Sequence, residues 1–281
     1  MLRNGDHWRH IEINGDALLD VWPPDCPAPV NGFQCKRQFE EAVSQMLSTL
    51  WEKSGTGRAL LLTIGDTAKR THTRLRIVPF TPAEQMMSPA GWRAYTLAAD
   101  PRKAAPRAAR LAPEPDDDDR EERFGRRQET GTGEGSDAEI HYDPFGFELG
   151  VNRFAALVHE LVHAVREMSG LLDPIPTERL LESYHNEEDY FATLVENIYR
   201  SEALSRLLLG FDGQMVPEDL GMSVGLLKDA TDSLPHRRLV SKLVTQMTGL
   251  CRNIRNHVPV GVAFNPIREF MHDGSRDTAK K

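Results

Sequence analysis

Hydrophobic residues recur at helical spacing in several stretches of the chain. The main stretches are Phe39–Trp51, Phe154–Met168, Phe191–Ile198 and Leu239–Leu250, with a shorter one at Val224–Leu227. Spacings of three and four residues put such side chains on one face of a helix, so each stretch predicts an amphipathic helix. Asn152 and Asn186 are suitable N-caps for two of these helices, and Gly170 is a suitable stop.

Shorter apolar runs predict strands. They are Ile11–Val21, where apolar and polar residues partly alternate, Ala59–Ile64, Leu75–Phe80 and Ile140–Asp143. Gly55 and Gly57, in the run Ser-Gly-Thr-Gly, are expected to separate the first helix from the strand that begins at Ala59. The last strand is expected to lie at a sheet edge, where an extended peptide could pair with it. Together the patterns predict an α+β fold with a small N-terminal sheet.

Composition and charge narrow the possible partners and compartment. The formal net charge of −8 gives no reason to expect binding to nucleic acid or an anionic membrane, and the basic run Arg102–Arg110 is followed at once by acidic residues. Three cysteines without a CxxC pair argue against a disulfide framework and suggest a reducing compartment. The polar N-terminus and the lack of any long apolar run disfavour a Sec signal and membrane insertion.

One motif in the second helical stretch carries chemistry. His159 and His163 are four residues apart, and Glu160 follows the first of them. Imidazoles at this spacing share a helix face and can both bind one tetrahedral Zn²⁺, while the glutamate acts as general base on a metal-bound water. Chance pairing on a core helix is the alternative. The helical context and the acidic residues that follow favour the metal.

A zinc site with two histidines and an open position needs a third protein ligand. We predict Glu188, because it flanks the apolar face of the helix that follows Asn186 and a metal would offset the cost of burying it. Glu187 is the main alternative, and Glu196 lies well off that face. A further reading is that Glu187, Glu188 and Asp189 merely stabilise the helix N-terminus.

Other polar residues receive weaker assignments. Tyr199 and Arg200 follow the predicted third ligand by about three turns, and either could stabilise an oxyanion. We name Tyr199 as a candidate catalytic residue, although a tyrosine in this position is more often part of the core. His141 is left out of the metal set, because two histidines and one carboxylate complete the expected ligands.

These motifs resemble a known family. The run His159–Ala164, followed by Asn186–Ala192 and Val195–Glu202, is similar to bacterial effector-type zinc metallopeptidases, which are gluzincin-like proteins exported by specialised secretion systems or carried as toxin domains. In that pattern the acid four positions before the alanine of the second helix binds the metal, which implies Glu188. The strand at Ile140–Asp143 and the run Phe264–Arg268 also fit the resemblance, and some relatives have a small polar residue where this chain has Glu196.

The resemblance implies a zincin-like domain that binds Zn²⁺ and cleaves a protein target inside another cell. The protein is then cytoplasmic in the producing cell and exported without a Sec signal, possible partners being a secretion-system component or a chaperone. Two other classes remain open. One is a zinc-dependent regulatory protein that acts on a single partner, although no DNA-binding helix-turn-helix is evident. The other is an inert structural site, against which the intact Glu160 argues.

The domain boundaries follow from composition. Residues 1–99 are expected to form the N-terminal α+β part of the catalytic domain, and residues 139–270 its metallopeptidase core. Between them, residues 100–138 contain charge blocks and the glycine-rich run Gly131–Ser136, which predicts a disordered or mobile insertion. A partner-binding segment is the alternative. Residues 271–281 are expected to be a disordered tail.

Overall fold

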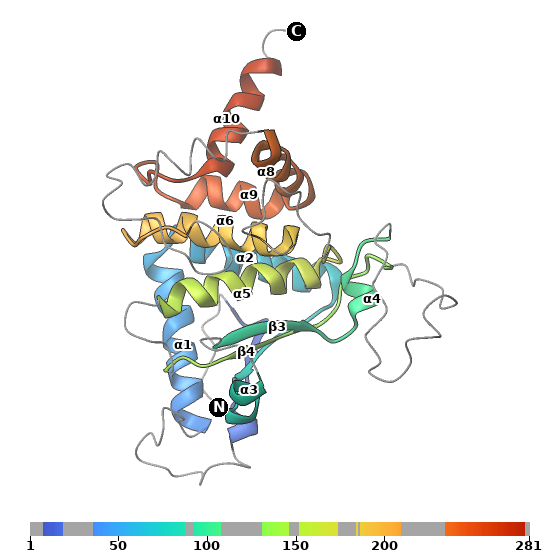
Figure 1. Ribbon diagram of the computed structural model, residues 1–281, viewed down its shortest axis with the longest axis vertical. Coiled ribbons are helices and arrows are strands. Elements are labelled where there is room, and N and C mark those ends of the chain that lie inside the picture. Colours follow the sequence, from blue (N-terminus) through green and yellow to red (C-terminus); the bar gives the residue numbers. More distant parts are fainter. Residues whose placement is uncertain are drawn as a thin grey trace.

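A small sheet lies beneath a stack of helices in the computed structural model (Figure 1). The structure describes residues 8–18, 36–87, 93–107, 131–145, 152–173, 184, 186–208 and 234–278. Its strands are β1 (Ile11–Ile13), β2 (Leu75–Pro79), β3 (Ala94–Ala98) and β4 (Ala138–Tyr142). Its helices are α1 (Lys36–Lys53), α2 (Gly55–Thr71), α3 (Pro82–Met87), α4 (Pro101–Ala104), α5 (Arg153–Met168), α6 (Glu187–Glu202), α8 (Leu234–Gln246), α9 (Thr248–His257) and α10 (Pro266–Thr278), with a 3-10 turn at Asp16–Leu18. The predicted α+β class is confirmed.

The sheet is mixed, with strand order β1-β2-β4-β3. β1, β2 and β4 run parallel to one another, and β3 runs antiparallel to β4. β3 therefore forms one edge of the sheet that the described residues build. The prediction that the strand near Ile140 lies at an edge is wrong, because β4 pairs with a strand on each side.

Helices α5, α6, α8, α9 and α10 form layers above one face of this sheet. Figure 1 shows α5 between the sheet and α6, with α8, α9 and α10 farther out. The faces of α5 and β4 toward each other are apolar: Leu157, Leu161, Ile140 and Tyr142 are all fully buried. α5 is thus enclosed by the sheet below and by helices above, which fixes the position of the histidines that it carries. No helix in the described ranges is both long and apolar enough to span a membrane.

One predicted strand is a helix in the structure. The run Ala59–Ile64 lies inside α2, and the preceding Ser-Gly-Thr-Gly segment is the start of that helix rather than a linker. Ser54 is its N-cap, accepting a hydrogen bond from the backbone N–H of Gly57 at 2.9 Å. A short apolar run cannot be distinguished from a buried helix by periodicity alone, and α2 has buried residues on several sides.

Parts of the two segments predicted to be disordered form helix or strand where the structure describes them. In the 100–138 segment, α4 ends at the fully buried Ala104 and is followed by the fully buried Ala105, and the backbone N–H of Thr132 donates a hydrogen bond to the Arg102 carbonyl at 2.8 Å. Glycine at position 135 is required, because φ is +89° and a Cβ atom would lie 2.1 Å from the Met168 carbonyl oxygen. Helix α10 extends into the predicted tail as far as Thr278. Residues 108–130, 279–281 and the predicted helix at 224–227 lie outside the described residues.

A carboxylate near the end of α6 binds the N-terminus of α2. Glu202 accepts hydrogen bonds from the Ser54 hydroxyl at 2.9 Å, from the Thr56 backbone at 3.0 Å and from the Gly55 backbone. Free N–H groups at a helix start favour an anion. We expect Glu202→Gln to lower the free energy of unfolding by about 1–2 kcal/mol in urea denaturation, whereas the exposed Glu52→Gln should change it little. Equal effects of the two substitutions would contradict this role.

Candidate metal centre

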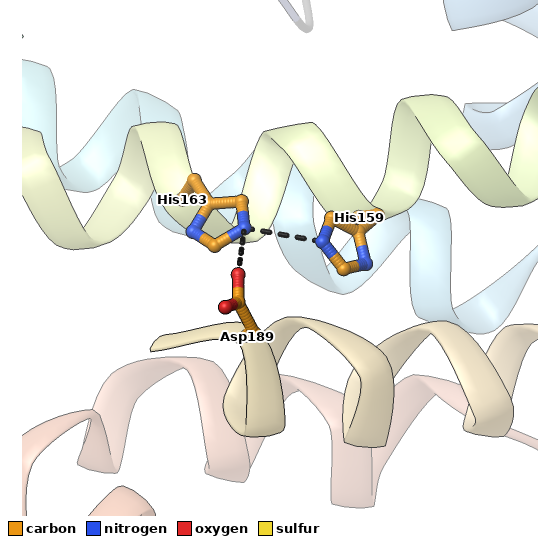
Figure 2. Close-up of side chains that lie close together, drawn as sticks. All are labelled: His159, His163 and Asp189. Carbon is orange, nitrogen blue, oxygen red and sulfur yellow. Dashed lines mark hydrogen bonds and ion pairs between the residues drawn. The ribbon is translucent and has the colours of Figure 1, made fainter. Parts of the chain in front are cut away.

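Helix α5 presents His159 and His163 toward α6. Its N-terminus is fixed by Asn152, whose side chain accepts hydrogen bonds from Phe154 and Ala155 at 3.1 and 3.2 Å, as the sequence predicts. Figure 2 shows the two imidazoles on neighbouring turns of α5, with Asp189 reaching toward them from the first turn of α6. Side chains from two helices therefore converge on one point.

The donor atoms are close enough to share one ion. The Nε2 atoms of His159 and His163 are 3.1 Å apart, and Asp189 Oδ1 lies 3.9 Å from His163 Nε2. One donor atom from each of the three residues lies within 4.8 Å of the others. Ligands about 2.0–2.1 Å from a tetrahedral Zn²⁺ are separated by about 3.3 Å, so small side-chain movements would complete such a shell. The residues fit a three-ligand metal site.

Glu196 forms a hydrogen bond with His159 through the ring nitrogen that does not face His163. Its Oε2 lies 3.0 Å from His159 Nδ1, and its Oε1 accepts hydrogen bonds from Arg200 at 2.8 and 2.7 Å. The expectation that Glu196 lies off the buried face is wrong, because its residue is only 4% exposed. Metal-binding histidines commonly donate their second ring N–H to a carboxylate, which fixes the ring and its tautomer. This contact leaves His159 Nε2 directed at the shared point.

The two histidines differ in their electrostatic surroundings. Burial lowers the pKa of His163 well below its ordinary value, and the nearby His159 and Arg166 act in the same direction. The pKa of His159 is raised: burial opposes its charge, but the hydrogen bond and charge of Glu196 prevail. The lowered pKa of His163 favours its neutral form, which is the form that binds a metal, whereas the raised pKa of His159 makes a metal compete with a proton there.

Glu160 lies beside this cluster on the side toward the sheet. Its Oε2 accepts a hydrogen bond from the Thr96 hydroxyl of β3 at 2.6 Å. Burial raises the pKa of Glu160, with opposing effects from His159 and Thr96 and further increases from Glu196 and Asp189. The Glu160 carboxylate is therefore close enough to interact with the charge of His159. Of the predicted site residues, the structure brings His159, Glu160 and His163 together.

The structure does not bring Glu188 to the cluster. Both of its oxygens bind Arg166, at 2.6 and 2.7 Å, and Oε1 also accepts a hydrogen bond from the Asp173 backbone at 2.8 Å. Glu187 binds Lys242 of α8 instead. The carboxylate of this turn that lies beside the histidines is that of Asp189. The prediction of Glu188 as the third ligand is therefore corrected to Asp189. Adjacent helical residues point about 100° apart, so the acid that faces Arg166 and the acid that faces the histidines are different residues.

Two other candidates lie elsewhere. Tyr199 is buried near the end of α6; burial raises its pKa to about 12, and the charges that affect it are those of Glu202 and Arg200. We therefore leave Tyr199 out of the proposed site. His141 lies on the sheet face opposite α5, with Nδ1 2.5 Å from Glu84 and its ring stacked on Tyr95 at 4.5 Å.

Comparisons of the chain with protein-family models, curated proteins and solved structures found no match. The site therefore rests on its own geometry. Sequence reasoning missed Asp189, Thr96 and the supporting role of Glu196. One signal for Glu196 was available, since Arg200 follows it at the i,i+4 spacing of a helical ion pair. Thr96 had none, because β3 was not predicted.

A buried acid at the end of α5 makes stability depend on pH. Burial, with the charges of Glu188 and Glu160, raises the pKa of Glu167 from 4.5 to about 9, and its Oε2 has no hydrogen-bond partner among the described residues. Between these two values the folded state binds more protons than the unfolded state, so stability falls as pH rises. Glu167→Gln should raise the free energy of unfolding by on the order of 2 kcal/mol at about pH 8 and leave it nearly unchanged at about pH 4. Urea denaturation at both pH values tests this, and a gain of equal size at both would contradict it.

Proposed function

We propose that this protein is a zinc-dependent peptidase in which His159, His163 and Asp189 hold the metal. One observation carries the proposal. The Nδ1 of His159 is held by Glu196, so that its Nε2 faces the Nε2 of His163 at 3.1 Å, with a carboxylate of α6 beside them. Two imidazoles and one carboxylate, with an outer carboxylate behind the first imidazole, form the ligand pattern of catalytic zinc.

Glu160 is the general base of the proposed reaction. When bound, Zn²⁺ would polarise a substrate carbonyl and lower the pKa of water at the site. The Thr96 hydroxyl holds Glu160 Oε2 at 2.6 Å, which leaves Oε1 to accept a proton from the attacking water. The buried, raised-pKa carboxylate can then deliver that proton to the leaving amine. The chemistry is hydrolysis of an amide bond.

The edge strand β3 favours a peptide as substrate. Thr96, its central residue, touches Glu160, and β3 has a strand partner only on its β4 side among the described residues. An extended peptide can pair with such an edge through backbone hydrogen bonds, which would carry its carbonyl groups past Glu160. An antiparallel edge strand beside the histidine helix also supports the zincin-like fold predicted from sequence.

The resemblance of the sequence motifs to effector-type zinc metallopeptidases extends the proposal to a biological role. We propose a secreted bacterial effector or toxin that acts on a protein in the target cell. The buried Glu160 carboxylate next to the proposed metal ligands supports this choice over the regulatory alternative, because binding one partner requires no general base.

Metal analysis combined with peptide cleavage tests the proposed activity. Protein purified without chelator should contain about one Zn²⁺ per chain. Incubated with a proteome-derived peptide mixture, it should generate new termini, detected by mass spectrometry, and a chelator should abolish them. Iron in place of zinc, or cleavage that persists after the metal is removed, would overturn the proposal.

A further inference from the structure

Arg166 is a fully buried arginine on α5, three residues after His163. Its Nε and Nη2 atoms bind the two oxygens of Glu188 at 2.6 and 2.7 Å, and Nη2 also donates to the Leu171 carbonyl at 2.7 Å. The Gln246 side chain accepts from it at 3.3 Å, and its guanidinium lies 4.5 Å from the centre of the Phe191 ring. The planar fork of the arginine is thus held in one orientation from several sides.

Three polar contacts cross the interface between α5 and α6 in sequence. Arg166 meets Glu188, His163 meets Asp189, and His159 meets Glu196. Residue numbers fall along α5 while they rise along α6, so the two helices are antiparallel. We call this series the α5–α6 ladder. The two outer contacts are hydrogen-bonded, at 2.6 and 3.0 Å, whereas the middle pair is 3.9 Å apart and includes two of the proposed ligands.

The known energetics of buried ion pairs indicate that the Arg166–Glu188 pair has a role besides stabilising the fold. A buried ion pair often contributes no more to stability than apolar residues of the same volume, and its best-attested role is to fix the register of packed elements. Glu188 and Asp189 are adjacent, so fixing the direction of the first sets the direction of the second. The pair therefore determines which carboxylate of this turn faces His163.

We propose that the Arg166–Glu188 ion pair is a positioning device that holds Asp189 in ligand geometry against His163. The inference rests on the proposed function, because it concerns the affinity of that metal site. The same turn offers a comparison: Glu187 is also an acid in an ion pair, but its partner Lys242 lies on α8 and not on α5. Both acids carry one charge in the first turn of α6, but Glu188 is buried and contacts α5, whereas Glu187 is partly exposed and contacts α8.

Zinc affinity of the full chain, measured by competition with a chromophoric chelator, tests the inference with Glu188→Gln and Glu187→Gln. Loss of an outer-shell partner typically costs 10–100-fold in metal affinity, and we expect Glu188→Gln to weaken zinc binding by about that factor. Glu187→Gln should weaken it less than about threefold. The visible spectrum of bound Co²⁺ should change with the first variant and not with the second, since it reports ligand geometry.

A second variant separates positioning from stability, because Glu188→Gln leaves Arg166 without its counter-charge. The double substitution Arg166→Met with Glu188→Leu removes both charges at similar volume, and urea denaturation of the metal-free protein should find it about as stable as wild type. Its zinc affinity should nevertheless fall about 10-fold or more. Wild-type affinity in the folded double variant, or equal losses from Glu187→Gln and Glu188→Gln, would overturn the inference alone. A wild-type chain that binds no zinc would overturn the proposed site and this inference with it.

Discussion

Replacing Glu160 by glutamine is expected to lower peptide hydrolysis by about 100- to 10,000-fold, the usual contribution of a general base. Glutamine keeps the size of the side chain and can still accept the Thr96 hydrogen bond. It cannot take a proton from water. Zinc content and thermal stability should stay close to wild type, because Glu160 is not among the proposed ligands. Measuring kcat and KM on a peptide that the wild type cleaves should place the loss in kcat.

The same variant tests the proposed toxicity. Expression of the wild type in a recipient cell should arrest growth, whereas zinc-loaded Glu160→Gln should not. A variant as harmful as the wild type would contradict a proteolytic mechanism and favour action by binding. Thr96→Val is a useful companion, since it leaves the carboxylate present but removes the hydroxyl that orients it. We expect it to lower kcat by a smaller factor than Glu160→Gln.

Removing a ligand side chain is expected to abolish stoichiometric zinc. His163→Ala and Asp189→Ala should each weaken zinc binding by more than about 100-fold, because loss of an outer-shell partner alone costs 10- to 100-fold. Asp66→Ala removes an exposed carboxylate of α2, whose side chain is 77% exposed, and serves as the control. Metal content after dialysis against a weak chelator measures the effect. Full zinc occupancy in Asp189→Ala would show that another carboxylate completes the site.

The sequence predicted the helices of the site well because their signals are local. The apolar spacing from Phe154 to Met168 and the caps Asn152 and Asn186 all depend on neighbours within a few residues, and the structure confirms each of them. Two histidines at i and i+4 on such a helix must share a face whatever surrounds them. The pairing of His159 with His163 was therefore available before any tertiary information.

Tertiary contacts decided what the sequence could not predict. Asp189 replaces Glu188 beside the histidines because Arg166, on another helix, binds Glu188. Glu196 was expected to lie well off the apolar face of its helix, but α6 is buried on several sides and Glu196 is buried with it. Ala59–Ile64 was expected to be a strand because it is a short apolar run. Apolar residues also fill a helix that is buried on several sides, as α2 is. The errors at Glu188 and Glu196 concern orientations, and the error at Ala59–Ile64 concerns burial, which local sequence patterns do not show.

The start of α2 depends on residues much later in the sequence, at the ends of α6 and α9. A Cβ atom on Gly55 would lie 2.2 Å from the His257 carbonyl oxygen, so the end of α9 approaches α2 too closely for any residue but glycine at this position. Glu202 accepts the hydrogen bonds at the N-terminus of α2. A nascent chain on the ribosome can therefore not bury α2 until about residue 257 has emerged. Contacts between such distant segments are closed late and slowly. We expect the native packing of α2 to form only after about residue 257 has left the ribosome, so that the shorter nascent chain stays accessible to chaperones during translation.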